Sequence, residues 1–187
     1  MDTNTLITKI KDQDDKVRTE AWLGAGEVGA PAVKPLAAVM TDSDMEVARA
    51  AKRGLWRIVH HVGRPGADDE EKAVVAELIA LLAGDDQPAS VRREVLWMLS
   101  EIGGDEVVPH SVALLTDKDL REDARMALQR IPGGASVAAL KSALTSAADD
   151  FKPNLAQSLR QRGQTVAGIP CQKLTPTKKT TVKPVGR

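Results

Sequence analysis

Few side chains in this chain have the types and spacing that catalysis or metal binding requires. The histidines are His60, His61 and His110, and the single cysteine is Cys171. His60 and His61 are adjacent and His110 lies far along the chain, so the i,i+4 pair typical of helical metal sites is missing. Cys171 has no histidine near it in sequence to activate its thiol. We therefore expect no catalytic residue, no metal site and no cofactor.

The same apolar spacing recurs five times along the chain and indicates the elements that must position any functional residue. From each of five apolar anchors, further apolar residues follow four, eight and eleven positions later, which is the spacing of one stripe of an α-helix. The last copy breaks this pattern at Arg162. A further apolar stretch precedes each anchor, so the repeat is a helical hairpin. The anchors are Val17, Val47, Val91, Leu120 and Phe151.

Residues suited to helix ends flank these stripes. Gly29, Gly103 and Gly163 follow the last stripe positions, where left-handed C-caps are expected, and Pro132 ends the fourth copy. The second and third anchors are further apart than the others, and the Pro and Gly residues there predict an inserted loop near residues 61–70 that leads into a helix start capped by acidic residues. Carboxylates that can cap free amide groups precede the stripes at Asp14, Asp42, Asp44, Asp86, Asp117 and Asp149.

Composition narrows the class of protein further. Hydrophobic residues make up 42% of the 187 residues, but the aromatic residues are three Trp and one Phe, with no Tyr. An all-β fold draws on β-branched and aromatic residues and is excluded. One cysteine cannot form an intrachain disulfide, no apolar run is long enough to span a membrane, and Met1–Asn4 does not resemble the start of a signal peptide. A cytoplasmic protein is expected.

The repeated phrase Asp-x-x-Val-Arg-x-x-Ala-x-x-x-Leu/Ala-x-x-Ile/Val-Gly resembles a HEAT repeat, of the short HEAT-like type found in phycobilisome lyase-related proteins. The resemblance implies an all-α fold, a right-handed α-α superhelix (a HEAT/armadillo-like solenoid) of about five helical hairpins over residues 1–163. It also implies that the second helix of each pair lines the concave face. One hairpin cannot bury its stripe alone, so neighbours must stack.

A basic residue recurs one position after most anchors, at Arg18, Arg92 and Arg121. Such a row is compatible with a track for anions. In HEAT-like families, however, this arginine typically bonds to Asp or carbonyl groups of adjoining loops. We therefore interpret the three arginines as a structural ladder between repeats.

The tryptophans project away from the apolar stripe. Trp56 and Trp97 point to the far side of their helices and Trp22 is intermediate. An indole left in water forgoes about 1.5–3 kcal/mol of burial. The rings are therefore expected to pack against the inserted loop or the C-terminal tail or to anchor a partner, with simple surface exposure as the remaining alternative. Trp22 is also placed to wedge between neighbouring repeats. The candidate partner-binding surface on the concave face contains Trp22, Arg53, Trp56, Arg93, Trp97, Arg125, Met126 and Gln129.

Residues 164–187 form a Pro/Thr/Lys-rich tail that we expect to be partly flexible. This tail carries five basic residues and no acidic one, whereas residues 1–163 carry 21 basic and 26 acidic residues. The tail is compatible with touching nucleic acid, with lying along the acidic solenoid, or with no role. Residues 167–171 are placed to pack on the last hairpin.

These observations favour a non-catalytic protein–protein interaction scaffold, a cytoplasmic monomer that binds an unidentified protein on its concave face. The family resemblance also implies an alternative, a bilin-lyase-type accessory factor. Nucleic-acid binding is less favoured, because contacts to phosphate supply most non-specific affinity and residues 1–163 are net acidic.

Overall fold

The computed structural model describes residues 1–84 and 87–171, so Asp86 and most of the tail lie outside the described residues. Within these ranges the ordered elements are helices and no strand is present, which confirms the all-α prediction. Five helical hairpins follow one another as α1 (Thr3–Ile10) with α2 (Asp15–Gly24), α3 (Val33–Val39) with α4 (Met45–Val62), α5 (Asp68–Ala83) with α6 (Ala89–Ile102), α7 (Val108–Ala113) with α8 (Arg121–Arg130), and α9 (Gly134–Ser146) with α10 (Lys152–Gln161).

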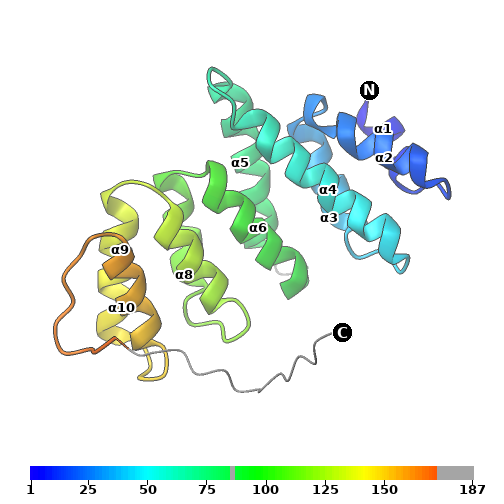
Figure 1. Cartoon of the computed structure of the whole chain (residues 1–187). Coiled ribbons are helices and arrows are strands. Elements are labelled where there is room, and N and C mark those ends of the chain that lie inside the picture. The colour runs from blue at the N-terminus through cyan, green and yellow to red at the C-terminus, as the bar shows by residue number, and fades with distance from the viewer. Residues whose placement is uncertain (85–86, 172–187) are drawn as a thin grey trace, which may run out of the picture.

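The hairpins stack in sequence order and form two layers, which makes the protein an α-solenoid. The second helices α2, α4, α6, α8 and α10 each contact the next in the row (Figure 1). The first helices α1, α3, α5, α7 and α9 form the other layer in the same way. Each hairpin therefore covers the flank of its neighbour, as expected of a repeat that cannot bury its own stripe.

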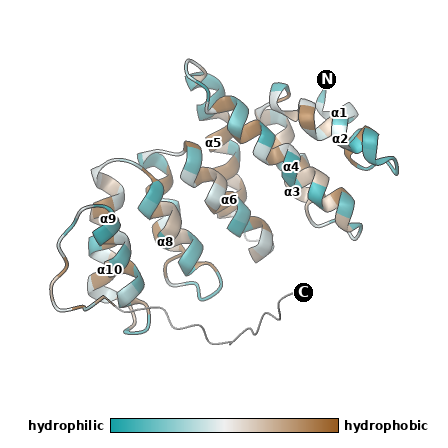
Figure 2. Ribbon diagram, in the orientation of Figure 1, coloured by the Kyte–Doolittle hydropathy of each residue, from teal (hydrophilic) through white to brown (hydrophobic). Residues whose placement is uncertain are grey.

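Most residues of the predicted apolar stripes lie in the core, together with apolar residues of the first helices, although Val17, Val28 and Ile102 of the stripes are only half-buried. Leu55, Leu99 and Leu128, the residues eight positions after their anchors, have no exposed surface. The equivalent residue of the first repeat, Ala25, is also buried, although α2 ends at Gly24 and Ala25 begins a 3-10 turn. Along each second helix, hydrophobic segments alternate with hydrophilic ones (Figure 2). The helical period therefore determines which side of each helix is covered.

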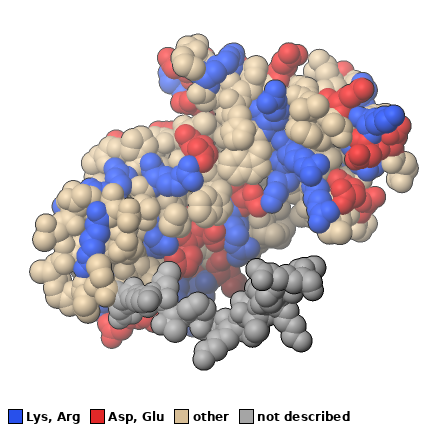
Figure 3. Space-filling view, viewed as in Figure 1, with Lys and Arg blue, Asp and Glu red and all other residues tan. Residues whose placement is uncertain are grey.

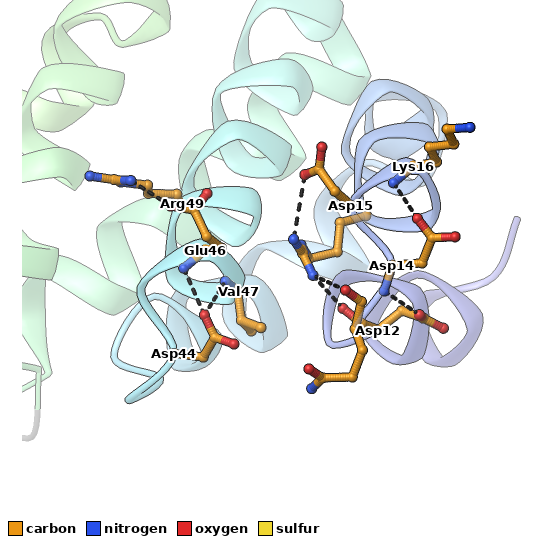
Figure 4. A network of polar contacts seen from close by, with 10 residues as sticks. Asp12, Asp14, Asp15, Lys16, Asp44, Glu46, Val47 and Arg49 are labelled. Carbon is orange, nitrogen blue, oxygen red and sulfur yellow. Dashed lines mark hydrogen bonds and ion pairs between the residues drawn. The ribbon is translucent and has the colours of Figure 1, made fainter.

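Aspartates cap the starts of α2 and α4 as predicted. The Asp14 carboxylate accepts a hydrogen bond from the Lys16 amide at 2.8 Å, and the Asp44 carboxylate accepts from the amides of Glu46 and Val47 (Figure 4). A carboxylate here satisfies amide groups that have no partner within the helix. Asp149 behaves differently, because its carboxylate binds the Lys152 ammonium at 2.8 Å instead of a backbone amide.

One of the three predicted glycine C-caps, Gly163 with φ 72°, is left-handed. Gly29 combines φ 68° with ψ −147°, which lies outside the left-handed helical region, and it precedes the 3-10 turn Ala30–Ala32 instead of capping α2. Gly103 is extended instead, with φ −85° and ψ 151°, so the prediction of a left-handed cap was wrong there. The chain turns directly into the 3-10 turn Asp105–Val107, and a Cβ on Gly103 would lie 2.5 Å from a methyl group of Val107. Close packing requires glycine at this position.

The extra residues between the second and third anchors mainly lengthen the helices α4 and α5, and only a short loop connects them. The helix α4 has 18 residues and α5 has 16, and only residues 63–67 connect them, so the predicted loop over 61–70 was too long. Val59 and Val62 are buried, which extends the covered stripe of α4 into the insertion. The first turn of α5 carries Asp68, Asp69, Glu70 and Glu71, as the helix dipole favours.

The first residues of the tail contact the last hairpin. The Arg160 guanidinium donates hydrogen bonds to the carbonyl oxygens of Val166 and Ile169. Val166 is half-buried and packs against the core. Residues 172–187, which hold all the basic residues of the tail, lie outside the described residues.

Candidate functional site

The eight candidate residues all lie on second helices. Trp22 belongs to α2, Arg53 and Trp56 to α4, Arg93 and Trp97 to α6, and Arg125, Met126 and Gln129 to α8. Because these helices succeed one another in the stack, the candidates form a band across four repeats (Figure 1). The second helices form one of the two layers of the solenoid. We call the side of this layer that carries the eight candidates the second-helix face.

Trp56 is linked to the next repeat. Its indole N–H donates to one carboxylate oxygen of Glu94 on α6 at 3.2 Å. The other carboxylate oxygen of Glu94 accepts from the Lys52 ammonium at 2.7 Å. The half-buried Trp56 therefore uses its polar edge to join α4 to α6.

Trp97 repeats this arrangement one hairpin further on. Its indole N–H donates to one carboxylate oxygen of Asp123 on α8 at 2.9 Å, and the other oxygen accepts from Arg93 Nε at 3.0 Å. The Arg130 guanidinium carbon lies 5.9 Å from the Trp97 ring centroid. Arg93 and Trp97 are thus engaged with the neighbouring repeat.

Sequence reasoning missed the two carboxylates that hold these indoles. Glu94 and Asp123 each lie three positions after their anchors, Val91 and Leu120. Asn154, three positions after Phe151, likewise bonds across to Glu122 of α8. This shared offset is a signal that the sequence contains, and it marks polar residues that face the preceding repeat.

The candidate residues on α8 also bond to other residues of the protein. Arg125 binds the Glu122 carboxylate at 2.8 Å and donates to the Ser158 hydroxyl of α10 at 2.6 Å. The same Ser158 hydroxyl donates to the Gln129 side-chain oxygen at 2.8 Å. Met126 is half-buried. The polar groups of this end hold α8 against α10.

The α2 and α4 end differs, and we define its residues Trp22, Leu23, Arg53, Trp56 and Arg57 as the α2–α4 surface. The Arg53 guanidinium carbon lies 5.7 Å from the Trp22 ring centroid, and Arg57 Nε donates to the Leu23 carbonyl oxygen at 3.2 Å. Neither arginine forms an ion pair with a carboxylate in residues 1–84 and 87–171. Leu23 is 47% exposed. Arg57 and Leu23 were not among the sequence candidates.

The recurring arginines hold loops. Arg18 donates to the carbonyl oxygens of Asp12 and Gln13 at 2.7 and 2.9 Å, within its own hairpin. Arg92 likewise donates to the Leu82 carbonyl of its own hairpin at 3.2 Å. The predicted ladder between repeats is therefore incomplete. Among the described residues, Arg121 bonds to the next hairpin, whereas Arg18 and Arg92 bond within their own.

Arg121 binds the Asp150 carboxylate at 2.7 Å and lies over the Phe151 ring at 4.8 Å. The hydrogen bond from Arg121 lowers the pKa of Asp150 below its ordinary value. A carboxyl with a lowered folded-state pKa stabilises the fold above its unfolded pKa, about 3.9, and loses that contribution as pH falls through the folded value.

Acid titration should therefore separate the Asp150→Asn variant from the native protein. The native protein is expected to lose more stability than the variant when the pH falls from about 5 to below the folded pKa of Asp150. Urea unfolding at several pH values measures this difference. Parallel curves for the two proteins would show that the Arg121–Asp150 pair adds no stability.

The chemistry-bearing side chains remain dispersed in the structure. Cys171 is exposed, and His61 Nε2 lies 3.9 Å from the Glu70 carboxylate. No group of three or more His, Cys, Asp or Glu side chains that could hold a metal ion occurs in the part of the chain the structure describes. No helix within those same residues is long and apolar enough to cross a membrane.

Comparisons with known proteins add little to this description. No protein-family model matches the chain, and no curated protein matches it. An engineered protein solved by a structural genomics consortium is 25% identical over 85% of this chain and 78% of its own, with a TM-score of 0.41. A designed armadillo repeat protein is 14% identical over 85% of this chain and 99% of its own, with a TM-score of 0.31. These TM-scores are low, so the solenoid assignment rests on the chain's own helices.

Proposed function

We propose that this protein is a non-catalytic interaction scaffold that binds a segment of a partner protein on its second-helix face. The observation that carries the proposal is that three half-buried tryptophans, Trp22, Trp56 and Trp97, lie on successive second helices. Trp and Arg are the residues most enriched at the centres of protein interfaces. Stacked repeats also provide an extended surface that suits an elongated partner.

The exposed Leu23 supports the same proposal. It follows Trp22 in α2, and most leucines of the structure are buried. An exposed apolar side chain provides area that a partner can cover, at about 25 cal/mol for each Å² of apolar surface removed from water. The second-helix face therefore contains exposed apolar area at Leu23 in addition to the tryptophans and arginines.

Site-specific photo-crosslinking in cells tests this proposal. A benzophenone amino acid at position 23 on α2 is expected to give adducts of defined mass with a protein partner. The matched control carries the same amino acid at position 112 on α7, where Val112 is a similarly exposed apolar residue on a first helix. The proposal is contradicted if position 23 gives no adduct, or if position 112 gives the same adducts.

A further inference from the structure

The helix α4 concentrates positive charge within an acidic body. It contains Arg49, Lys52, Arg53 and Arg57, and its single acidic residue is Glu46. All four cations are exposed, and their spacing places them on neighbouring turns of one side of the helix. Figure 3 shows Lys and Arg side chains gathered over this helix. Residues 1–163 as a whole carry more acidic than basic groups.

Carboxylates of the protein compensate two of these cations. Arg49 binds Glu46 at 2.5 Å, and Lys52 binds Glu94 of α6 at 2.7 Å. Arg53 and Arg57 have no such partner among the residues described. Glu20, an exposed acidic residue of the adjacent α2, forms no ion pair with either of them. Two guanidinium groups one helical turn apart are therefore available for an external anion.

The surroundings of these guanidinium groups are aromatic and apolar. Arg53 lies over Trp22, Arg57 is held at the Leu23 carbonyl, and the Trp56 ring lies 5.6 Å from the His60 ring. Guanidinium groups bind carboxylates through two parallel hydrogen bonds, and a fixed position reduces the entropy lost on binding. The α2–α4 surface thus combines two positioned cations with half-buried aromatic side chains.

The spacing of the two arginines matches an extended chain. Residues at i and i+4 of a helix have Cβ atoms about 5–6 Å apart. Alternate residues of an extended strand lie on one side and are about 6.6 Å apart. An extended segment with the pattern acidic-x-acidic therefore presents its two carboxylates at nearly the spacing of Arg53 and Arg57.

We propose that the partner segment is an acidic, extended peptide whose Glu or Asp side chains bind Arg53 and Arg57 while its apolar residues cover Trp22 and Leu23. This inference rests on the proposed function and names the chemistry of the partner. Charge complementarity of this kind gives specificity and raises the association rate, and added salt weakens it.

Fluorescence anisotropy with a short labelled peptide tests the inference. The probe contains Glu-x-Glu and leucine, and the comparison probes are the same peptide with Gln for Glu and a DNA duplex. The native protein is expected to bind the acidic peptide, more weakly as salt rises, and to bind the Gln peptide at least several-fold less well. The Arg53→Gln, Arg57→Gln double variant should weaken binding roughly five- to thirty-fold, because each exposed charge pair contributes a modest amount.

The matched control is the Lys34→Gln, Lys141→Gln double variant, which removes the same charge from exposed residues on first helices α3 and α9. It should bind the acidic peptide like the native protein. The Arg53→Glu variant gives a second readout, because among the described residues it removes only the contact of Arg53 with the Trp22 ring, and it should also weaken binding of the acidic peptide. Equal weakening by both double variants, tighter binding of the duplex than of the peptide, or no peptide binding each overturns the inference. If one of these results is obtained but position 23 still gives crosslinks to a protein, the proposed scaffold function is retained and only the acidic-peptide inference fails.

Discussion

The Leu55→Ala variant is expected to have a free energy of unfolding about 2–5 kcal/mol lower than that of the native protein. Leu55 has no exposed surface and lies on α4, which packs against α2, α3, α5 and α6. Removing its side chain leaves a cavity that several elements would have to close together. Chemical denaturation followed by circular dichroism measures the difference.

The matched control for this prediction is Leu23→Ala. It makes the same chemical change on the neighbouring second helix, but Leu23 is 47% exposed. Its expected effect is within about 0.5 kcal/mol. Equal destabilisation by the two variants would show that α4 is not enclosed by its neighbours and would refute the stacked arrangement.

The Arg162→Leu variant is expected to lose about 1.5–3 kcal/mol of stability, although it restores the apolar pattern of the fifth repeat. The Arg162 guanidinium donates to the carbonyl oxygens of Gln129 at 3.1 Å and Gly133 at 2.8 Å, and to the Ser136 hydroxyl at 3.1 Å. These oxygens lie at the end of α8 and the start of α9. A positive charge there also interacts favourably with the α8 dipole.

The control is Gln161→Leu, an adjacent exposed polar residue at the end of α10. Its expected effect on the thermal unfolding midpoint is small. A midpoint for Arg162→Leu equal to or above that of the native protein would show that the carbonyl contacts add nothing beyond the apolar stripe.

The period of the apolar residues was sufficient to predict the fold. Burial at the eighth position after each anchor follows from helical geometry, so Leu55, Leu99 and Leu128 could be placed in the core from spacing alone. The length of the loop near residue 65 could not be predicted in this way. Pro65 and Gly66 mark the turn, but Val59 and Val62 on one side and the acidic residues 68–71 on the other extend the helices toward it.

The candidate surface was predictable only in part. Helical angles predicted that Trp56 and Trp97 point away from the core, but the half-buried Trp56 packs against it. The angles also do not specify the residues that meet these rings. Glu94 and Asp123 come from the next repeat in each case, and such contacts depend on how hairpins stack. For the same reason the sequence did not distinguish Arg93 and Arg125, which are paired, from Arg53, which is not.

The indole N–H signals of the ¹⁵N-labelled protein provide the most direct test of the partner-binding surface. The three tryptophans give three such signals, which Trp→Phe variants assign. Titration with the acidic peptide is expected to shift the signals of Trp22 and Trp56, which lie on the α2–α4 surface, more than the signal of Trp97, which lies on α6. A Trp97 signal that moves as far as the others, or three signals that do not move, would contradict the account.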